Sequence, residues 1–251
     1  MRNLIKKRYA CILLLLLVIG AGCSDWLDVR PRNEMKEDDM YANEEGFKSA
    51  LTGAYIQLAA EGLYGRDASM YLPEMLAQHW TISTDKTSLI YNICAFDYTH
   101  EKSEEAIEKL WKKYYQCIVH LNNVLGNLET TGVTFTNGNE DLIKGEALGL
   151  RGFLHLELLR LFGPIPREAT ASSPAIPYQE EMTKDPGKLH TITYKEVCEK
   201  IVRDLDAAEK LLVKDPILVG SNRQLNQPAY DWEGKPQDEW QFYRQVRFNY
   251  Y

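Results

Sequence analysis

The segment of residues 139–166 reads NEDLIKGEALGLRGFLHLELLRLFGPIP. Its apolar residues recur with the period of an α-helix and predict one buried face. Asn139 is a good capping residue for the start of such a helix. The pair Gly163 and Pro164 predicts its end, because glycine closes a helix and proline cannot continue one. The predicted buried face consists of Ile143, Ala147, Leu150, Leu154, Leu158 and Leu161.

Glycines at positions 145, 149 and 152 lie on one face of the same predicted helix. Each costs about 1 kcal/mol relative to alanine inside a helix, so a compensating contact is expected. A membrane dimer of the GxxxG type is one explanation. It is disfavoured because Lys144, Glu146 and Arg151 place charges in the same segment. We therefore expect a second helix to pack very close to this face.

Four further helices are predicted from the same periodicity, whereas residues 81–99 have no sustained period. Because the second helix contains Pro73, it fits only if that proline lies in the opening turn. The four are a helix from Asn43 to about Leu58, one from about Ala68 to Trp80, a long one from the cap Ser103 to about Leu128, and one that begins with the capping box of Thr193 and Glu196.

The helix after Thr193 is expected to bury Val197, Ile201, Leu205, Ala208 and Leu212. The predicted caps of the two central helices lie 36 residues apart, close to the period of tetratricopeptide helix pairs. The sequence therefore predicts an all-α, tetratricopeptide-like helical repeat with long irregular loops.

The first 22 residues have the features of an export signal. Four basic residues precede an apolar run from Cys11 to Ile19, and Gly20, Ala21 and Gly22 are small. The run is too short to span a bilayer. Cys23 follows at the position where a bacterial lipoprotein is cleaved and acylated, although the lipobox normally has an aliphatic residue where Gly20 stands. An ordinary secretory signal with Cys23 as an incidental thiol is the alternative.

Charge and cysteine content exclude two classes of protein. Removing the signal leaves 25 of 29 Lys and Arg residues against 36 Asp and Glu, a net charge of −11, which does not suit binding to nucleic acid phosphates. Apart from Cys11 and Cys23, the remaining cysteines are Cys94, Cys117 and Cys198. An odd number without a short pair does not predict a disulfide scaffold, so free thiols are expected.

No catalytic or metal-binding motif is evident. The five histidines have no HExxH spacing, and the chain has no GxSxG, Walker A or GxGxxG motif. Asp204 and Asp206 could be imagined as a glycosidase pair, but a solvated helix face is the preferred interpretation. His155 is likewise interpreted as a packed helix residue. We expect neither a metal nor a cofactor, and not an enzyme.

Four segments together resemble the SusD/RagB family of outer-membrane lipoproteins. Residues 23–28 (CSDWLD) are similar to the lipidated start of that family, and residues 43–58 (NEEGFKSALTGAYIQL) to its first helix. Residues 146–166 (EALGLRGFLHLELLRLFGPIP) are the most specific match, and 247–251 (RFNYY) look like the start of a further repeat helix. The resemblance covers almost the whole mature chain as the N-terminal half of a typical member.

The resemblance implies a division into a lipoprotein signal peptide (1–22), a tether (23–37) and an N-terminal helical domain that is incomplete at its C-terminus (38–251). It also implies lipid anchoring in the outer membrane, facing the cell exterior. Such proteins bind oligosaccharides, or in some branches peptides, and deliver them to a SusC-like TonB-dependent transporter. A structural helical-repeat adaptor and a non-functional fragment of the binding protein are the alternatives, and an enzyme acting on glycans is the least favoured hypothesis.

Candidate ligand contacts come from the aperiodic segments, where aromatic and polar residues occur together. Sugar rings stack on Trp and Tyr, and their hydroxyls need polar partners. The alternative is that these aromatic residues attach long loops to the helical core. The candidates are Trp80, Asp85, Tyr91, Trp232 and Trp240, with Asn92 and Tyr230 beside them.

Overall fold

The computed structural model describes residues 37–79, 84–183 and 189–214, and these residues are predominantly helical, as predicted. In chain order the elements are α2 (Glu37–Met40), α3 (Glu44–Ala59), the π-helical turn η2 (Asp67–Tyr71), α4 (Leu72–Leu76), α5 (Leu89–Cys94), α6 (Glu101–Thr130), α7 (Asn139–Phe162), α8 (Tyr194–Leu211) and the 3-10 turn η4 (Leu212–Lys214).

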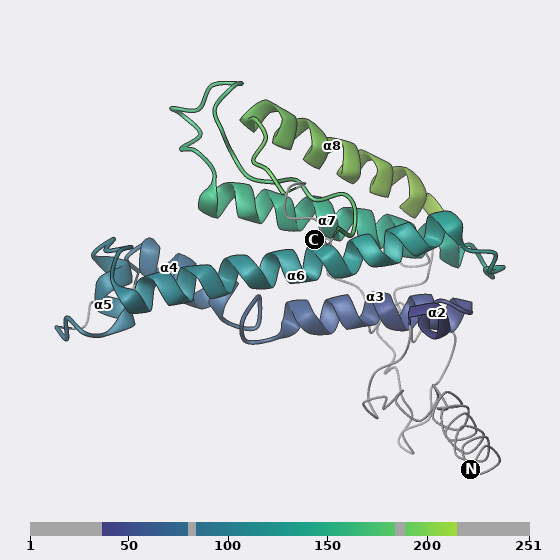
Figure 1. Ribbon diagram of the computed structural model, residues 1–251, viewed down its shortest axis with the longest axis horizontal. Helices are drawn as coiled ribbons and strands as arrows, with labels where there is room; N and C mark the ends of the chain where they lie inside the picture. The colour runs from purple at the N-terminus through teal and green to yellow at the C-terminus, as the bar shows by residue number, and fades with distance from the viewer. Residues whose placement is uncertain (1–36, 80–83, 184–188, 215–251) are drawn as a thin grey trace, which may run out of the picture. The chain divides into compact units, whose positions relative to one another are not determined.

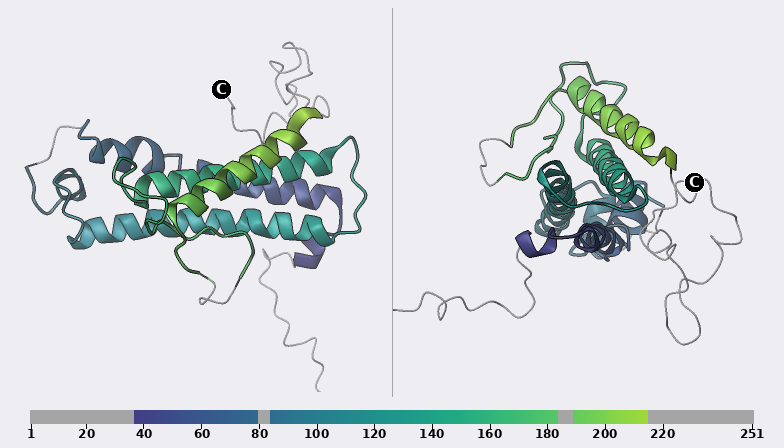
Figure 2. Two further views of the ribbon diagram at one scale, coloured as in Figure 1. Left: turned by 90° about the horizontal axis from the view of Figure 1, so that it is seen from above. Right: turned by 90° about the vertical axis from the view of Figure 1, so that its right-hand side faces the viewer.

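The four long helices form an antiparallel array. α3 packs against α6 and α7, α6 packs against α7, and α7 packs against α8, with consecutive long helices running in opposite directions (Figure 1). α8 crosses α7 obliquely, as Figure 2 shows. The short helices α4 and α5 lie at the N-terminal end of α6 (Figure 1). This is the arrangement that successive helix pairs of a repeat produce.

The core lies between α3, α6 and α7 and consists of the apolar faces that the sequence predicts. Burying each side chain of this size contributes about 1.5–3 kcal/mol to the stability of the fold. The largest fully buried side chains among them are Phe47, Leu51 and Leu58 of α3, Tyr114, Ile118 and Leu121 of α6, and Ile143, Leu154 and Leu158 of α7.

Two predicted helix starts are confirmed in atomic detail. The Asn43 side chain accepts a hydrogen bond of 3.0 Å from the Gly46 backbone N–H at the start of α3. At the start of α8, Thr193 and Glu196 form the complete capping box, in which each side chain accepts from the other residue's backbone N–H. Both caps satisfy backbone amides that would otherwise lack partners.

Two other predicted caps are wrong by one to three residues. His100, and not Ser103, caps α6, and Ser103 lies inside the first turn with a fully buried hydroxyl that makes no hydrogen bond within the described part of the chain. Gly138, with a φ of 80°, caps α7. Asn139 is the first helical residue, and its amide donates to Glu44 Oε1 at 2.6 Å.

The second predicted helix is shorter than expected and is preceded by a π-helical turn. η2 leads into the five-residue α4 with Pro73 in its opening turn, as required of a proline. The chain leaves the helix after Leu76, because Gln78 takes a φ of 56°. Conversely, α5 lies in the segment that showed no period. Its six residues are too few for periodicity, although Ser88 caps it through a 3.1 Å bond from the Tyr91 N–H.

The prediction of close packing at the glycine face of α7 is confirmed. A Cβ on Gly152 would lie 3.2 Å from Leu205 Cδ2 and 3.4 Å from the Ile201 carbonyl oxygen of α8. A Cβ on Gly145 would lie 2.8 Å from Leu212 Cγ. The predicted burial of Leu205 is wrong, because its side chain is 39% exposed and Asp204 takes the buried position beside it.

Candidate ligand-binding site

Several predicted site residues lie outside the described residues. They are the proposed lipid-bearing Cys23, Trp80, Trp232 and Trp240, together with Tyr230. Their roles therefore remain predictions.

Asp85, Tyr91 and Asn92 lie in and just before α5, where two of them organise the loop. Asp85 is exposed, and its carboxylate accepts hydrogen bonds from the Thr87 hydroxyl at 2.7 Å and the Thr87 N–H at 2.9 Å. These bonds lower the pKa of Asp85. The buried Asn92 amide donates to the Ser88 carbonyl at 2.8 Å. Tyr91 is half-buried, and neither it nor Asp85 lines the groove described next.

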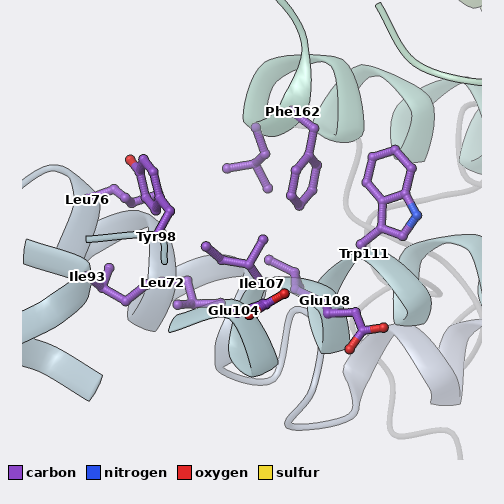
Figure 3. Close-up of a pocket in the computed structure, with 11 residues that line it drawn as sticks. Leu72, Leu76, Ile93, Tyr98, Glu104, Ile107, Glu108, Trp111 and Phe162 are labelled. Atoms are coloured by element: carbon purple, nitrogen blue, oxygen red, sulfur yellow. The ribbon is translucent and has the colours of Figure 1, made fainter. Parts of the chain in front are cut away.

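A groove of about 470 Å³ opens beside α5, between α4, α6 and the end of α7 (Figure 3). Tyr98 stands at one end and Trp111 at the other, and Phe162 meets the Trp111 ring edge-on at 4.9 Å (Figure 3). Most of the wall is aliphatic. It includes Leu72, Leu76, Ile93, Ile107, Leu110 and Leu161.

The chemistry of this groove suits apolar groups better than sugar hydroxyls. Its polar side chains are Glu104 and Glu108 of α6, with the Tyr98 hydroxyl and the Trp111 N–H at the ends. Two carboxylates along an aliphatic wall provide few donors for a hydroxylated ligand. The groove therefore has the composition of a contact surface for apolar groups.

Beyond α7, residues 174–183 form an extended strap that is held by a buried polar network. Ala175 donates to the Ile192 carbonyl at 2.9 Å, which joins the strap to the residues before α8. Arg151 of α7 binds both oxygens of Asp204 of α8, at 2.6 and 3.0 Å, and donates to the strap carbonyl of Glu180 at 3.2 Å. The strap, α7 and α8 are therefore one hydrogen-bonded unit.

Asn122 and His155 complete the network around Gln179. The Gln179 N–H donates to His155 Nε2 at 3.1 Å, and the Gln179 carbonyl accepts from the Asn122 amide at 3.1 Å. Tyr178 stacks on the His155 ring at 3.7 Å and donates to Asp204 at 2.8 Å. His155 Nδ1 lies 2.9 Å from the Arg151 carbonyl, which can only accept, so the proton is on Nδ1.

The network keeps His155 neutral and Asp204 charged. Burial lowers the pKa of His155 to about 4, so the ring carries no charge at neutral pH. For Asp204, burial alone would raise the pKa, but the hydrogen bonds and positive charge of Arg151 outweigh it and lower the pKa. The prediction that His155 is a packed helix residue agrees with this geometry. The interpretation of Asp204 as part of a solvated face is wrong, because its side chain is buried against Arg151.

Sequence reasoning missed both the groove and the strap as features. Trp111 of α6 is only half-buried and lines the groove, yet it was not among the predicted ligand contacts. Two consecutive turns of α6 carry aromatic residues outside the core stripe, Trp111 and Tyr115, and this repetition was the available signal. The strap has no helical period and therefore gave no signal.

The antiparallel helix pairs, the absence of strands among the described residues and the strap define a helical-repeat protein of the tetratricopeptide-like class. A family model of SusD-like proteins, described as starch-binding and associating with the outer membrane, matches residues 25–225. The chain therefore belongs to the SusD-like family.

Relatives and solved structures agree with this assignment. The chain is 24% identical over 207 residues to SusD-like protein P2 of Formosa agariphila, and 23% identical over 208 residues to SusD-like protein P38 of the same organism. Each match covers 82% of this chain but only 38% of the relative. A SusD superfamily protein of Bacteroides thetaiotaomicron superposes with a TM-score of 0.54 at 22% identity, covering 67% of this chain and 37% of that one. A SusD-like carbohydrate binding protein of Bacteroides vulgatus gives 0.53 at 21%, covering 67% and 36%.

Proposed function

We propose that the protein is an outer-membrane surface lipoprotein that binds oligosaccharides, or peptides in place of them, and delivers them to a SusC-like TonB-dependent transporter. The family match over residues 25–225 is the observation that carries this proposal. The chain spans 38% of the length of the curated relatives it matches. Delivery to a transporter is therefore attributed to the complete protein of which this chain supplies the N-terminal helical part.

The proposed anchor is an acyl group on Cys23, with residues 1–22 as the signal peptide, 23–37 as the tether and 38–251 as the helical domain. The basic and apolar start of the chain and the small residues before Cys23 support this division. Among the described residues, no helix is long and apolar enough to cross a membrane. A lipid on Cys23 would supply the membrane attachment.

A binding role, and not catalysis, is proposed for the helical domain. The family description is one of binding. Two side chains that could serve acid–base chemistry, His155 and Asp204, are buried and engaged with backbone groups and Arg151. A structural adaptor at the cell surface is the second candidate, since helical repeats commonly present extended contact surfaces. A fragment without binding activity is the third.

Expression of the chain in a Bacteroides host separates these candidates. Cells are labelled with an alkyne fatty acid, and the protein is then isolated from outer membranes. We expect the wild-type protein to carry the fatty acid and Cys23→Ala to lack it. We also expect a barrel transporter to co-purify with the wild type. Retardation in gels that contain a neutral polysaccharide would separate a glycan-binding protein from a structural adaptor. Release of reducing sugar by the pure protein would instead support an enzyme.

A further inference from the structure

A second concavity, here called the trough, lies between α6 and the strap and has a volume of about 450 Å³. Trp111, Tyr115 and Gln116 of α6 line one side, and Pro177, Gln179 and Glu181 of the strap line the other. Its size is within the range of roughly 300–1,000 Å³ that small-molecule sites occupy. None of these residues was among the candidates taken from the aperiodic segments.

Alternate residues of the strap face opposite sides, as in an extended chain. Pro177, Gln179 and Glu181 line the trough, whereas Tyr178 donates to Asp204 and Glu180 pairs with Lys200 and Arg203 on the other side. The Tyr115 hydroxyl donates to the Pro177 carbonyl at 2.8 Å and so joins the two walls directly. The trough is therefore formed before a ligand arrives, which reduces the entropy lost on binding.

The floor of the trough is aromatic. The rings of Trp111 and Tyr115 lie 4.8 Å apart, inclined by 51°, and both side chains are half-buried. Pyranose rings present C–H faces that pack on such surfaces. The amides of Gln116 and Gln179 and the carboxylate of Glu181 line the same trough, and such groups can donate to and accept from sugar hydroxyls.

Charge and backbone bonding narrow the class of ligand. Among the described residues that line the trough, Lys112 is the one cationic side chain and lies 2.6 Å from Glu108, and Glu181 adds a negative charge. The described lining residues therefore offer an anionic sugar no excess of positive charge. An extended peptide that paired with the strap would need free backbone N–H and C=O groups on the strap. The backbone N–H of Gln179 is already bonded to His155, and its backbone carbonyl to Asn122. Both observations favour a neutral saccharide.

We propose that the trough binds a neutral oligosaccharide, with one ring packed on Trp111 and Tyr115 and its hydroxyls bonded to Gln116, Gln179 and Glu181. The proposal rests on the glycan-binding function proposed above and locates a subsite of that function in the N-terminal helices.

The test is isothermal titration of the full chain carrying Cys23→Ser with maltoheptaose, xylohexaose, mannohexaose and tetragalacturonate. Gln116→Ala and Glu181→Ala are each expected to weaken binding of the preferred neutral sugar by about three- to tenfold, because each removes one hydrogen-bonding group. Val119→Trp, one turn beyond Tyr115, is expected to extend the aromatic floor and tighten binding.

Matched controls lie outside the trough. Glu129→Ala removes an exposed carboxylate elsewhere on α6, and Ile56→Trp adds an indole at an exposed position of α3. Both are expected to leave the affinity unchanged, and circular dichroism checks that every variant is folded.

Each outcome has a distinct meaning. Wild-type binding that none of the trough variants alters would overturn the subsite and leave the glycan-binding function in place. Tighter binding of tetragalacturonate that the trough variants weaken would overturn the neutral class of ligand. No binding of any of the four sugars by the wild type would refute both the subsite and the glycan-binding function of this chain.

Discussion

Replacement of Arg151 by methionine tests whether the buried polar network holds α7, α8 and the strap together. Arg151 is 6% exposed and Asp204 is 2% exposed. The guanidinium makes two bonds to Asp204, a third of 3.0 Å to Asn122 Oδ1 and a fourth to the Glu180 carbonyl. Methionine keeps much of the side-chain volume but removes the charge and all four bonds.

The expected loss of stability follows from the charge that remains. Removing one partner of a buried ion pair costs about 3–5 kcal/mol, because the other charge is left without compensation. Asp204 keeps a 2.8 Å bond from Arg203 and another from Tyr178. We therefore expect Arg151→Met to lower the free energy of unfolding by about 3 kcal/mol, at the lower end of that range. The double variant Arg151→Met/Asp204→Leu removes the stranded carboxylate and should recover most of this loss.

Urea unfolding at pH 7, followed by circular dichroism, measures these differences, and an unchanged slope shows that the same surface is exposed on unfolding. The pKa of Asp204 is lowered in the folded state, so its contribution is complete above the ordinary pKa of an aspartate and is lost as the pH falls below it. The wild type should therefore lose more stability on acidification than the double variant. A loss below about 1 kcal/mol in Arg151→Met, or a double variant less stable than the single one, would refute the reasoning.

Three further outcomes are expected. Gly152→Leu should lower the free energy of unfolding measured in urea by about 1–3 kcal/mol, because the leucine side chain would meet Leu205 of α8. The control Gly126→Ala, with no neighbour within 4 Å, should leave stability equal or up to about 1 kcal/mol higher. Equal melting temperatures for the two variants would contradict close packing of α7 and α8. Burial alone would raise the pKa of Glu44, but hydrogen bonds from Lys48, Thr136 and Asn139 lower it to about 2. Glu44→Gln should therefore lower the free energy of unfolding by about 1–2 kcal/mol at neutral pH, and this difference should shrink as the pH falls from about 4.5 towards 2. A difference that does not depend on pH would count against this role. Cys23→Ala should move the protein from the membrane fraction to the soluble fraction, and undiminished retention would argue against acylation.

The helical core could be predicted because it depends on local patterns. The apolar residues of α3, α6 and α7 recur with a period of 3.6 residues over many turns, and the Asn43 cap and the capping box of α8 are short sequence motifs. The predictions were wrong where the sequence pattern spans less than one or two helical turns. Ser103 was mistaken for a cap because serine suits both a cap and a buried first turn, and α5 has only six residues.

The candidate sites depend on contacts between distant segments, which no local pattern encodes. Asp204 is separated from Arg151 by 53 residues and looked like part of a charged surface, yet the two side chains form a buried pair. The trough exists because Tyr115 meets Pro177 across 62 residues. The predicted contacts Asp85 and Tyr91 were chosen by residue type alone. The structure leaves their roles as predictions and adds surfaces that residue type did not indicate.

The alternation along the strap separates residues that stabilise the fold from residues that can be substituted. Tyr178 and Glu180 are tied to α8, so replacing them should weaken folding, whereas the side chains of Pro177, Gln179 and Glu181 project away from those ties. Mutations at the second set can therefore accumulate with little penalty in stability. After gene duplication, one copy could acquire a different ligand through substitutions at every other residue of the strap, while its helical fold stays the same.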